Sequence, residues 1–381
     1  MEFLSFLADY PIPFLVLLTV VVFVHELGHF WVARQCGVKV EVFSVGFGPE
    51  LLGVTDRHGT RWKFSAIPLG GYVKMFGQSE TVSAEGGAER EMTAAEKSVS
   101  FHHKGLGQRT AIVAAGPAAN YALTVVAFLA LFATFGEPVS LLPTVGTVAT
   151  DSGAEAAGIL PGDRILEVDG KPISQFEELV AAVESSRGRP LSLKLQRGDE
   201  QIDLTAQPRL MSDPSTATDS APTEHFRLGI TPGYDAVYER RGIVEAAINA
   251  VSQTYVRTVV TLQVLGQMIV GSRSSQEIGG VIGIAKIAGD QAQKSLPDFL
   301  FLIPILSLNL GLLNLFPIPL LDGGHLVFYA IERLRGRPLG ANAQEWGARI
   351  GLTFVLGLMV FATWNDLVRL QVVEFIKNLV V

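Results

Sequence analysis

The chain of 381 residues is apolar: hydrophobic residues make up 48% of it, charged residues make up 18%, and the mean hydropathy is +0.34. Together with several long apolar runs, these values favour a polytopic membrane protein and exclude an ordinary soluble domain. The formal net charge of -7 offers no basic surface, so nucleic acid is not an expected partner. Cys36 is the only cysteine, which excludes an intramolecular disulfide and a thiolate metal cluster.

Four apolar segments are candidates to cross a bilayer of about 30 Å. They cover residues 12–33, 110–135, 299–316 and 350–364, and the last is short unless flanking residues extend it. The first is expected to be a retained helix and not a signal peptide, because no Lys or Arg precedes it and no small-residue cleavage site follows it. Lys and Arg concentrate after the first and third segments, so the positive-inside rule predicts that these two loops are cytoplasmic.

The first apolar segment contains an HExxH motif, formed by His25, Glu26 and His29. Positions i and i+4 share a helix face, so the two imidazoles can converge on one zinc ion, with Glu26 close to a metal-bound water. Chance would produce such a motif in roughly one chain in a hundred of this composition, so the motif needs support from elsewhere in the sequence. Ionisable groups inside a membrane helix are costly, which favours a functional explanation.

A catalytic zinc site normally keeps three protein ligands, and Asp322 is the candidate for the third. It follows Pro317 and Pro319, which cannot continue a regular helix, so the third apolar segment is expected to break just before it. The alternative is an ordinary helix end with a turn at Asp322-Gly323. His325 is near enough in sequence to support the ligands.

HExxH in the first segment and N-x-x-P-x-P-x-x-D-G, from Asn314 to Gly323, resemble the motifs of the site-2 protease family of intramembrane zinc metalloproteases, peptidase family M50. The resemblance covers nearly the whole chain and is greatest to the bacterial RseP-like branch. It implies that Zn2+ is bound by His25, His29 and Asp322, that Glu26 is the general base, and that Asn314 holds the substrate backbone.

Residues 116–120 are similar to a second family element, G-x-x-x-N, in which a small residue allows close helix packing and the amide can bond to polar groups nearby. This element adds Gly116 and Asn120 to the candidate substrate-binding residues.

A PDZ domain is also recognisable, because the string G-x-x-x-G-D-x-I-L-x-V-D-G-x-x-I over residues 158–173 resembles that fold. PDZ domains bind extended peptide ends at a sheet edge, so a peptide C-terminus or a substrate ectodomain is an expected partner.

Between the first two spans the pattern changes from helical to alternating, in residues 38–45, 61–67 and 70–75. We expect a small antiparallel sheet whose edge, with Gly70 and Gly71, captures an unwound substrate by strand addition, because lipid offers no partner to exposed backbone groups. The alternative is a purely structural hairpin at the cytoplasmic surface. Residues 79–97 are polar and acidic and are expected to form a mobile loop.

The expected fold is a polytopic α-helical membrane protein with about four transmembrane helices, a membrane-associated β-hairpin or sheet, and one inserted PDZ domain of the α+β class. A membrane-surface amphipathic helix is predicted for residues 242–270, with a fifth span as the alternative. The expected parts, in chain order, are the first transmembrane helix (1–36), the β region and loop (37–109), the second helix (110–136), the PDZ domain (144–210), the linker and surface helix (211–298), the third helix with its broken end (299–325), and a cytoplasmic loop, fourth helix and tail (326–381).

The family resemblance implies intramembrane cleavage of single-span membrane proteins, such as an anti-sigma factor, after a prior cut by another protease. The expected location is the bacterial inner (cytoplasmic) membrane, with lipid as a partner, the active site toward the cytoplasmic face and the PDZ domain on the periplasmic side. One alternative is a catalytically inactive PDZ-bearing membrane scaffold or quality-control adaptor. A transporter is disfavoured because the sequence shows no inverted repeat.

Overall fold

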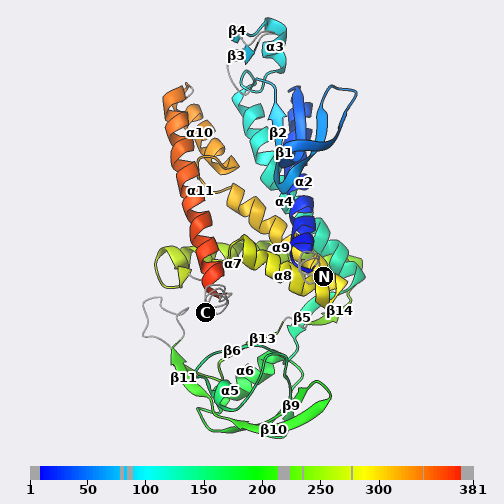
Figure 1. Ribbon diagram of the computed structural model, residues 1–381, viewed down its shortest axis with the longest axis vertical. Helices are drawn as coiled ribbons and strands as arrows, with labels where there is room; N and C mark the ends of the chain where they lie inside the picture. The colour runs from blue at the N-terminus through cyan, green and yellow to red at the C-terminus, as the bar shows by residue number, and fades with distance from the viewer. Residues whose placement is uncertain are drawn as a thin grey trace, which may run out of the picture. The chain divides into compact units, whose positions relative to one another are not determined.

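The computed structural model describes residues 9–77, 81–83, 89–212, 224–233, 236–275, 278–337 and 339–369 (Figure 1). These residues divide into two compact units. Unit 1 lies within residues 1–130, 247–261 and 276–381, and unit 2 lies within residues 131–246 and 262–275. Each unit has a hydrophobic core of its own.

Four helices are long and apolar enough to cross a membrane, which confirms the four predicted spans. They are α2 (Pro11–Gln35), α4 (Leu106–Thr134), α9 (Leu296–Asn314) and α11 (Ala341–Arg369). The fourth exceeds the apolar segment 350–364 because α11 already begins in the polar stretch before it. Helix α7 (Ile243–Ile269) is not among the four, so the described residues offer no fifth helix of this kind, and its place on the membrane surface stays a prediction.

Small residues let the spans of unit 1 approach one another beside the HExxH motif. A Cβ on Gly28 of α2 would overlap the Ala115 carbonyl oxygen and lie 2.7 Å from the Cβ of Ala119, both in α4. A Cβ on Gly311 of α9 would lie 3.1 Å from the Cβ of Asn120. Close backbone packing of this kind holds apolar helices together where lipid removes the hydrophobic driving force. Helices α2, α4 and α9 therefore form one packed group around the motif.

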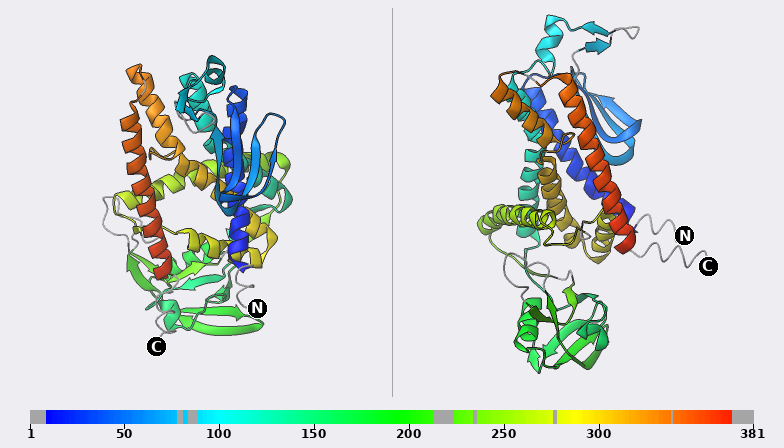
Figure 2. Two further views of the ribbon diagram at one scale, coloured as in Figure 1. Left: turned by 45° about the horizontal axis from the view of Figure 1, so that its top comes forward. Right: turned by 90° about the vertical axis from the view of Figure 1, so that its left-hand side faces the viewer.

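The chain between α2 and α4 forms a long hairpin of β1 (Val40–Thr55) and β2 (Arg61–Met75), which Figure 2 shows alongside α2. Bulges break its register, and residues 42–45, near the start of β1, each have two partners in β2, as Phe43 pairs with both Trp62 and Val73. The three short strands that the alternation predicts are therefore parts of two long strands folded against each other. Phe43 also stacks on the Trp62 ring with centroids 4.4 Å apart, which anchors the inner part of the hairpin.

The loop predicted for residues 79–97 contains secondary structure where it is described. Two short strands, β3 (Thr81–Ser83) and β4 (Glu89–Glu91), pair with each other, and α3 (Ala94–Val99) follows them. The Thr93 hydroxyl accepts a hydrogen bond from the Glu96 N–H while the Glu96 carboxylate accepts one from the Thr93 N–H. This capping box is a local helix signal that the polar composition obscures. Residues 78–80 and 84–88 lie outside the described residues.

The third span ends where the prolines predict. Helix α9 ends at Asn314, irregular turns follow, and α10 (Asp322–Arg335) then begins. A Cβ on Gly323 would overlap the backbone of Leu315, so glycine is required for the start of α10 to fold back against the end of α9. Helix α10 extends into the segment from residue 326 that the sequence analysis expects to begin with a cytoplasmic loop, and the side of the membrane on which it lies stays a prediction.

Helix α8 (Val281–Lys294) packs against α2, α9 and α11 within unit 1. Its first turn is capped from α11, because the Asp366 carboxylate accepts hydrogen bonds from the N–H groups of Gly280 and Gly283 at 2.9 and 2.8 Å. A carboxylate at a helix N-terminus satisfies unpaired amides and matches the helix dipole. This cap fixes one end of the fourth span to α8.

Unit 2 is an α+β domain, as predicted for residues 144–210. Its main sheet has the order β10-β9-β7-β8, and a second pair joins β6 to β13. The core is formed by buried apolar side chains of the sheet and of α6, including Ile165, Leu179, Leu193 and Leu195. The elements are β6 (Val145–Val148), α5 (Gly153–Ala156), β7 (Arg164–Val168), β8 (Lys171–Pro172), α6 (Phe176–Ser185), β9 (Leu191–Arg197), β10 (Glu200–Ala206) and β13 (Ile230–Pro232).

Unit 2 includes strands beyond residue 210, where the sequence analysis ends the expected PDZ domain. Strand β13 pairs with β6. The polar linker between them in the sequence gives no indication of this pairing. The remaining strands also pair across long separations, and they are β5 (Glu137–Leu141) with β14 (Ala236–Glu239) and β11 (Arg209–Ser212) with β12 (Glu224–Arg227). The segment 213–223, between β11 and β12, lies outside the described residues.

Candidate metal centre

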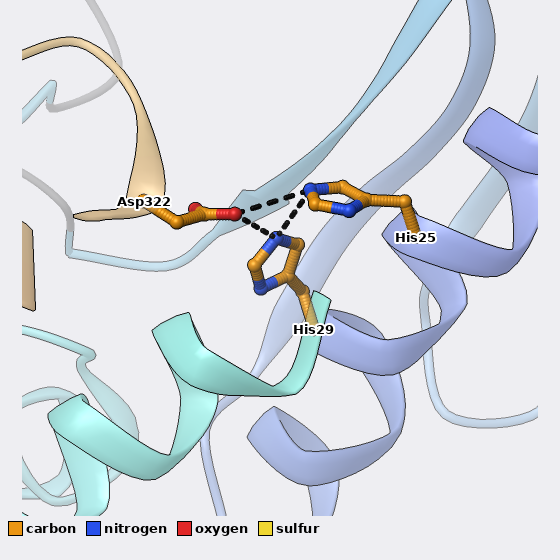
Figure 3. A group of neighbouring side chains, drawn as sticks. All are labelled: His25, His29 and Asp322. Atoms are coloured by element: carbon orange, nitrogen blue, oxygen red, sulfur yellow. Dashed lines mark hydrogen bonds and ion pairs between the residues drawn. The ribbon is translucent and has the colours of Figure 1, made fainter. Parts of the chain in front are cut away.

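Three side chains from two helices of unit 1 point toward one another in Figure 3. His25 and His29 lie one turn apart on α2 and are buried, with 7% and 8% of their surfaces exposed. Asp322 is the first residue of α10. The Nε2 atoms of the two imidazoles are 3.2 Å apart, and the Asp322 Oδ2 atom lies 3.2 Å from that of His25 and 3.4 Å from that of His29.

These three atoms fit a tetrahedral zinc ion. Bonds of about 2.0–2.1 Å place neighbouring ligand atoms about 3.3 Å apart, which is close to each side of the observed triangle. The Asp322 Oδ2 atom is buried without a hydrogen-bond partner. A carboxylate oxygen and two imidazole lone pairs that face one another need a cation between them, so the donor set suits a metal.

The second nitrogen of each imidazole has a partner in α4. The Nδ1–H of His29 donates to the Ile112 carbonyl oxygen at 2.8 Å, which leaves its Nε2 lone pair free for a metal. The Nδ1 atom of His25 lies 3.3 Å from the side-chain amide nitrogen of Asn120. Neither contact is predictable from sequence spacing, because both depend on how α2 and α4 pack.

Glu26 lies beside the triangle, next to the end of β2. The Val73 N–H donates a hydrogen bond to the Glu26 carboxylate. A Cβ on Gly71 would come within 3.2 Å of the Glu26 Cγ atom and 2.8 Å of the Ser44 carbonyl oxygen. Strand β2 therefore runs against the HExxH helix at the position of the acid, and glycine allows that approach.

The residues predicted to bind substrate lie around the three proposed metal ligands or in strand β2. The Asn314 amide nitrogen, at the end of α9, is 3.5 Å from His25 Nε2. Gly116 lies under both imidazoles, because a Cβ there would overlap the ring of His29 and come within 2.9 Å of His25 Cε1. Asn120 is wholly buried. Gly70 adopts a φ of 123°, where β2 bends beside Gly71.

His325 lies one turn beyond Asp322 but in a different environment. It contributes to the lining of a cavity of about 280 Å³, together with Arg109, Tyr329 and Glu332. Its ring makes an edge-to-face contact with Phe328, with centroids 6.4 Å apart. A role of His325 in orienting the proposed metal ligands stays a prediction.

Unit 2 has a groove of about 500 Å³ between α6 and the β12–β13 region. Its lining is mainly apolar and includes Phe176, Leu179, Val183, Phe226 and Ile230. An apolar groove beside a strand is the kind of surface on which PDZ domains hold extended peptides.

Comparison with known proteins identifies the family to which the sequence is similar. The family model described as peptidase family M50 matches residues 13–358. A Rhizobium meliloti protein, provisionally named a zinc metalloprotease, is 44% identical over 94% of this chain and 96% of its own length. Metalloprotease MmpA of Caulobacter vibrioides is 36% identical, covering 97% of this chain and 98% of its own length. The regulator of sigma-E protease RseP of Salmonella typhimurium is 32% identical, covering 94% and 98%.

Among solved structures, the PDZ domain of the SdrC-like protein Lmo2051 from Listeria monocytogenes is 22% identical. The match covers 23% of this chain and 84% of that chain, with a TM-score of 0.19. The α+β arrangement of unit 2 rests on its own strand pairing.

Proposed function

Because the chain belongs to peptidase family M50 and is a zinc metalloendopeptidase, we propose that it cleaves single-span membrane proteins within the bilayer. In this proposal His25, His29 and Asp322 hold the zinc ion. The observation that carries it is the triangle of their ligand atoms, with sides of 3.2, 3.2 and 3.4 Å inside a group of spanning helices. When bound, zinc polarises the scissile carbonyl and acidifies water at neutral pH.

Glu26 is the proposed general base. It neighbours both ligating histidines on α2, so it can accept a proton from the attacking water and pass that proton to the leaving amine. The Val73 N–H holds the carboxylate in place. Asn314, whose amide nitrogen lies 3.5 Å from His25 Nε2, is placed to donate a hydrogen bond to the substrate backbone.

Strand β2 is the proposed binding surface for the unwound substrate. A peptide bond in a transmembrane helix is shielded, and local unwinding exposes N–H and C=O groups that lipid cannot satisfy. Residues 71–75 of β2 pair with β1 on one side and reach Glu26 on the other. A substrate segment added as a further strand there would lie next to the base, because glycine at position 71 brings β2 close to Glu26.

The proposed setting is a bacterial inner membrane, with the metal centre toward the cytoplasm and unit 2 on the periplasmic side, which the Lys and Arg distribution supports. The name of the Salmonella relative refers to regulation of sigma-E. An anti-sigma factor, already shortened by another protease, is therefore a proposed substrate. The unit 2 groove would bind an apolar peptide end of such a protein.

Co-expression with a library of tagged single-span proteins tests this function. Wild type and Glu26→Gln are compared, with Glu200→Gln, an exposed residue of β10, as the matched control. We expect cleavage fragments with wild type and Glu200→Gln and none with Glu26→Gln, which should still contain zinc. Full cleavage by Glu26→Gln, or a purified active enzyme without metal, would contradict the proposal. Zinc binding without cleavage of any protein would favour the scaffold alternative.

A further inference from the structure

Asn120 is fully buried in α4, between the HExxH helix and α9. Its side-chain amide nitrogen lies 3.3 Å from His25 Nδ1. Within the part of the chain that the structure describes, this is the hydrogen-bond contact of that ring nitrogen. The amide oxygen of Asn120 is buried and has no hydrogen-bond partner in this orientation. A buried amide in such a position is expected to have a defined task, because an unsatisfied polar atom is costly.

The orientation of the amide decides which nitrogen of His25 carries the proton. If the Asn120 nitrogen donates to Nδ1, the ring proton sits on Nε2 and points at His29 and Asp322, where it blocks metal binding. If the amide is turned by 180°, its oxygen accepts from Nδ1–H and the Nε2 lone pair faces the other two ligands. Oxygen and nitrogen of an amide are assigned from hydrogen bonding, so the ligand geometry selects the second orientation.

We propose that Asn120 is a positioning residue for the metal centre: its side-chain oxygen accepts a hydrogen bond from Nδ1–H of His25 and fixes the ligating tautomer. This inference rests on the proposed zinc site. The tautomer of His29 is fixed in the same way by the Ile112 carbonyl oxygen, which accepts a hydrogen bond from Nδ1–H of that ring. This carbonyl belongs to the backbone, so no substitution removes it. Asn120 is therefore the point at which a side-chain change can disturb the orientation of one ligand without touching any ligand.

The backbone around Asn120 is fixed by contacts that do not involve its amide. The Thr124 and Ser307 hydroxyls both donate to the Asn120 carbonyl oxygen at 2.9 Å. Ser307 lies in α9, so this bond joins α9 to α4 at the same residue. Ser307→Ala thus offers a control that weakens the local helix packing but leaves the His25 contact intact.

The test measures zinc affinity of the purified full-length protein by competition with a chelator. Asn120→Leu keeps the side-chain shape and removes both polar atoms, and we expect zinc to bind about 10–100-fold more weakly. Asn120→Asp keeps an acceptor oxygen, so its affinity should stay within a few-fold of wild type. Ser307→Ala should also bind zinc like wild type. Cobalt substitution gives a second readout, because the visible absorption of bound Co2+ should change only in Asn120→Leu.

Wild-type zinc affinity in Asn120→Leu would overturn the proposal. So would a loss in Asn120→Asp equal to that in Asn120→Leu, because an acceptor alone would then not suffice, or an equal loss in Ser307→Ala, which would indicate a merely structural role. If Asn120→Leu fails to accumulate, a loss of zinc affinity in Asn120→Asp would still overturn the proposal, since the aspartate can only accept from the ring. A wild-type protein that binds no zinc would instead refute the proposed function itself.

Discussion

The three proposed ligands each contribute one atom to the metal centre, so each is expected to be indispensable. Asp322→Ala or His29→Ala leaves two ligands, fewer than the three that a catalytic zinc site keeps. We expect the zinc content of the purified protein to fall from about one equivalent to near zero, with loss of cleavage. Mass spectrometry of the metal content and a cleavage assay measure the two effects.

His325 provides the comparison for that prediction. It is a histidine of α10 close to Asp322 in sequence, but its ring packs on Phe328 at the cavity beside Arg109. His325→Ala should therefore retain zinc at the wild-type stoichiometry. A loss of zinc in His325→Ala as large as in His29→Ala would show that the ligand set has been assigned wrongly.

At the residue scale, the sequence was informative where chemistry and spacing coincide. The i, i+4 histidines and an acid after a proline-broken helix suffice to nominate His25, His29 and Asp322, which the structure brings within 3.4 Å of one another. Their role as ligands stays a prediction. The partners of the second ring nitrogens could not be predicted, because a backbone carbonyl such as that of Ile112 has no sequence signature.

Helix α4 supports the metal centre through a glycine. A Cβ on Gly116 would overlap the His29 ring and crowd His25, and both rings are confined by their own hydrogen bonds. We expect Gly116→Ala to weaken zinc binding by about 10-fold or more while the protein still folds, because alanine suits a helix. Gly107→Ala, in the same helix with nothing within 4 Å of the added Cβ, is the matched control. Equal zinc affinities in the two variants would disprove the packing argument.

Helix α10, which carries Asp322, is tied to α4 by an ion pair. Arg109 donates to Glu332 at 2.5 Å, both side chains are largely buried, and the guanidinium lies 5.0 Å from the centre of the Tyr329 ring. Removing one partner leaves the other buried without compensation, which costs about 3 kcal/mol or more. We expect Arg109→Met to lower the Tm by several degrees and to reduce zinc retention. The double variant Arg109→Met/Glu332→Leu should recover most of the Tm, and a Tm as low as that of Arg109→Met alone would contradict this account.

At the element scale, hydrophobic length predicted the spans and the prolines predicted the end of α9, because both are local properties. Pairings over long separations were not predictable in the same way. The fold of β2 against β1 depends on bulges, and the pairing of β13 with β6 joins residues on either side of a polar linker. Helix α10 is a third case, since its pattern is too short to stand out next to two spans.

At the scale of the whole molecule, the two units have separate cores, so their stabilities can respond differently to pH. In unit 2, Asp163 is 1% exposed and accepts two hydrogen bonds from Arg197, at 2.8 and 2.7 Å. Burial by itself would raise the pKa of the Asp163 carboxyl, but the bonds from Arg197 and from the Leu160 N–H outweigh it and hold the pKa below its usual value. All four tryptophans belong to unit 1, so their fluorescence follows that unit alone.

Unit 2 should therefore lose stability in acid through Asp163. Since its folded-state pKa is below the unfolded value of about 3.9, the ionised carboxylate stabilises unit 2 above about pH 4, and this stabilisation is lost as the pH falls through the folded-state pKa. We expect the amide protection factors of β7 and β9 to fall as the pH drops below about 4, while tryptophan fluorescence changes less. In Asp163→Asn the protection should already be low at pH 5 and depend little on pH, whereas Asp203→Asn, at an exposed position of β10, should behave like wild type. An unchanged acid response in Asp163→Asn would mean that other carboxylates govern the acid stability of this domain.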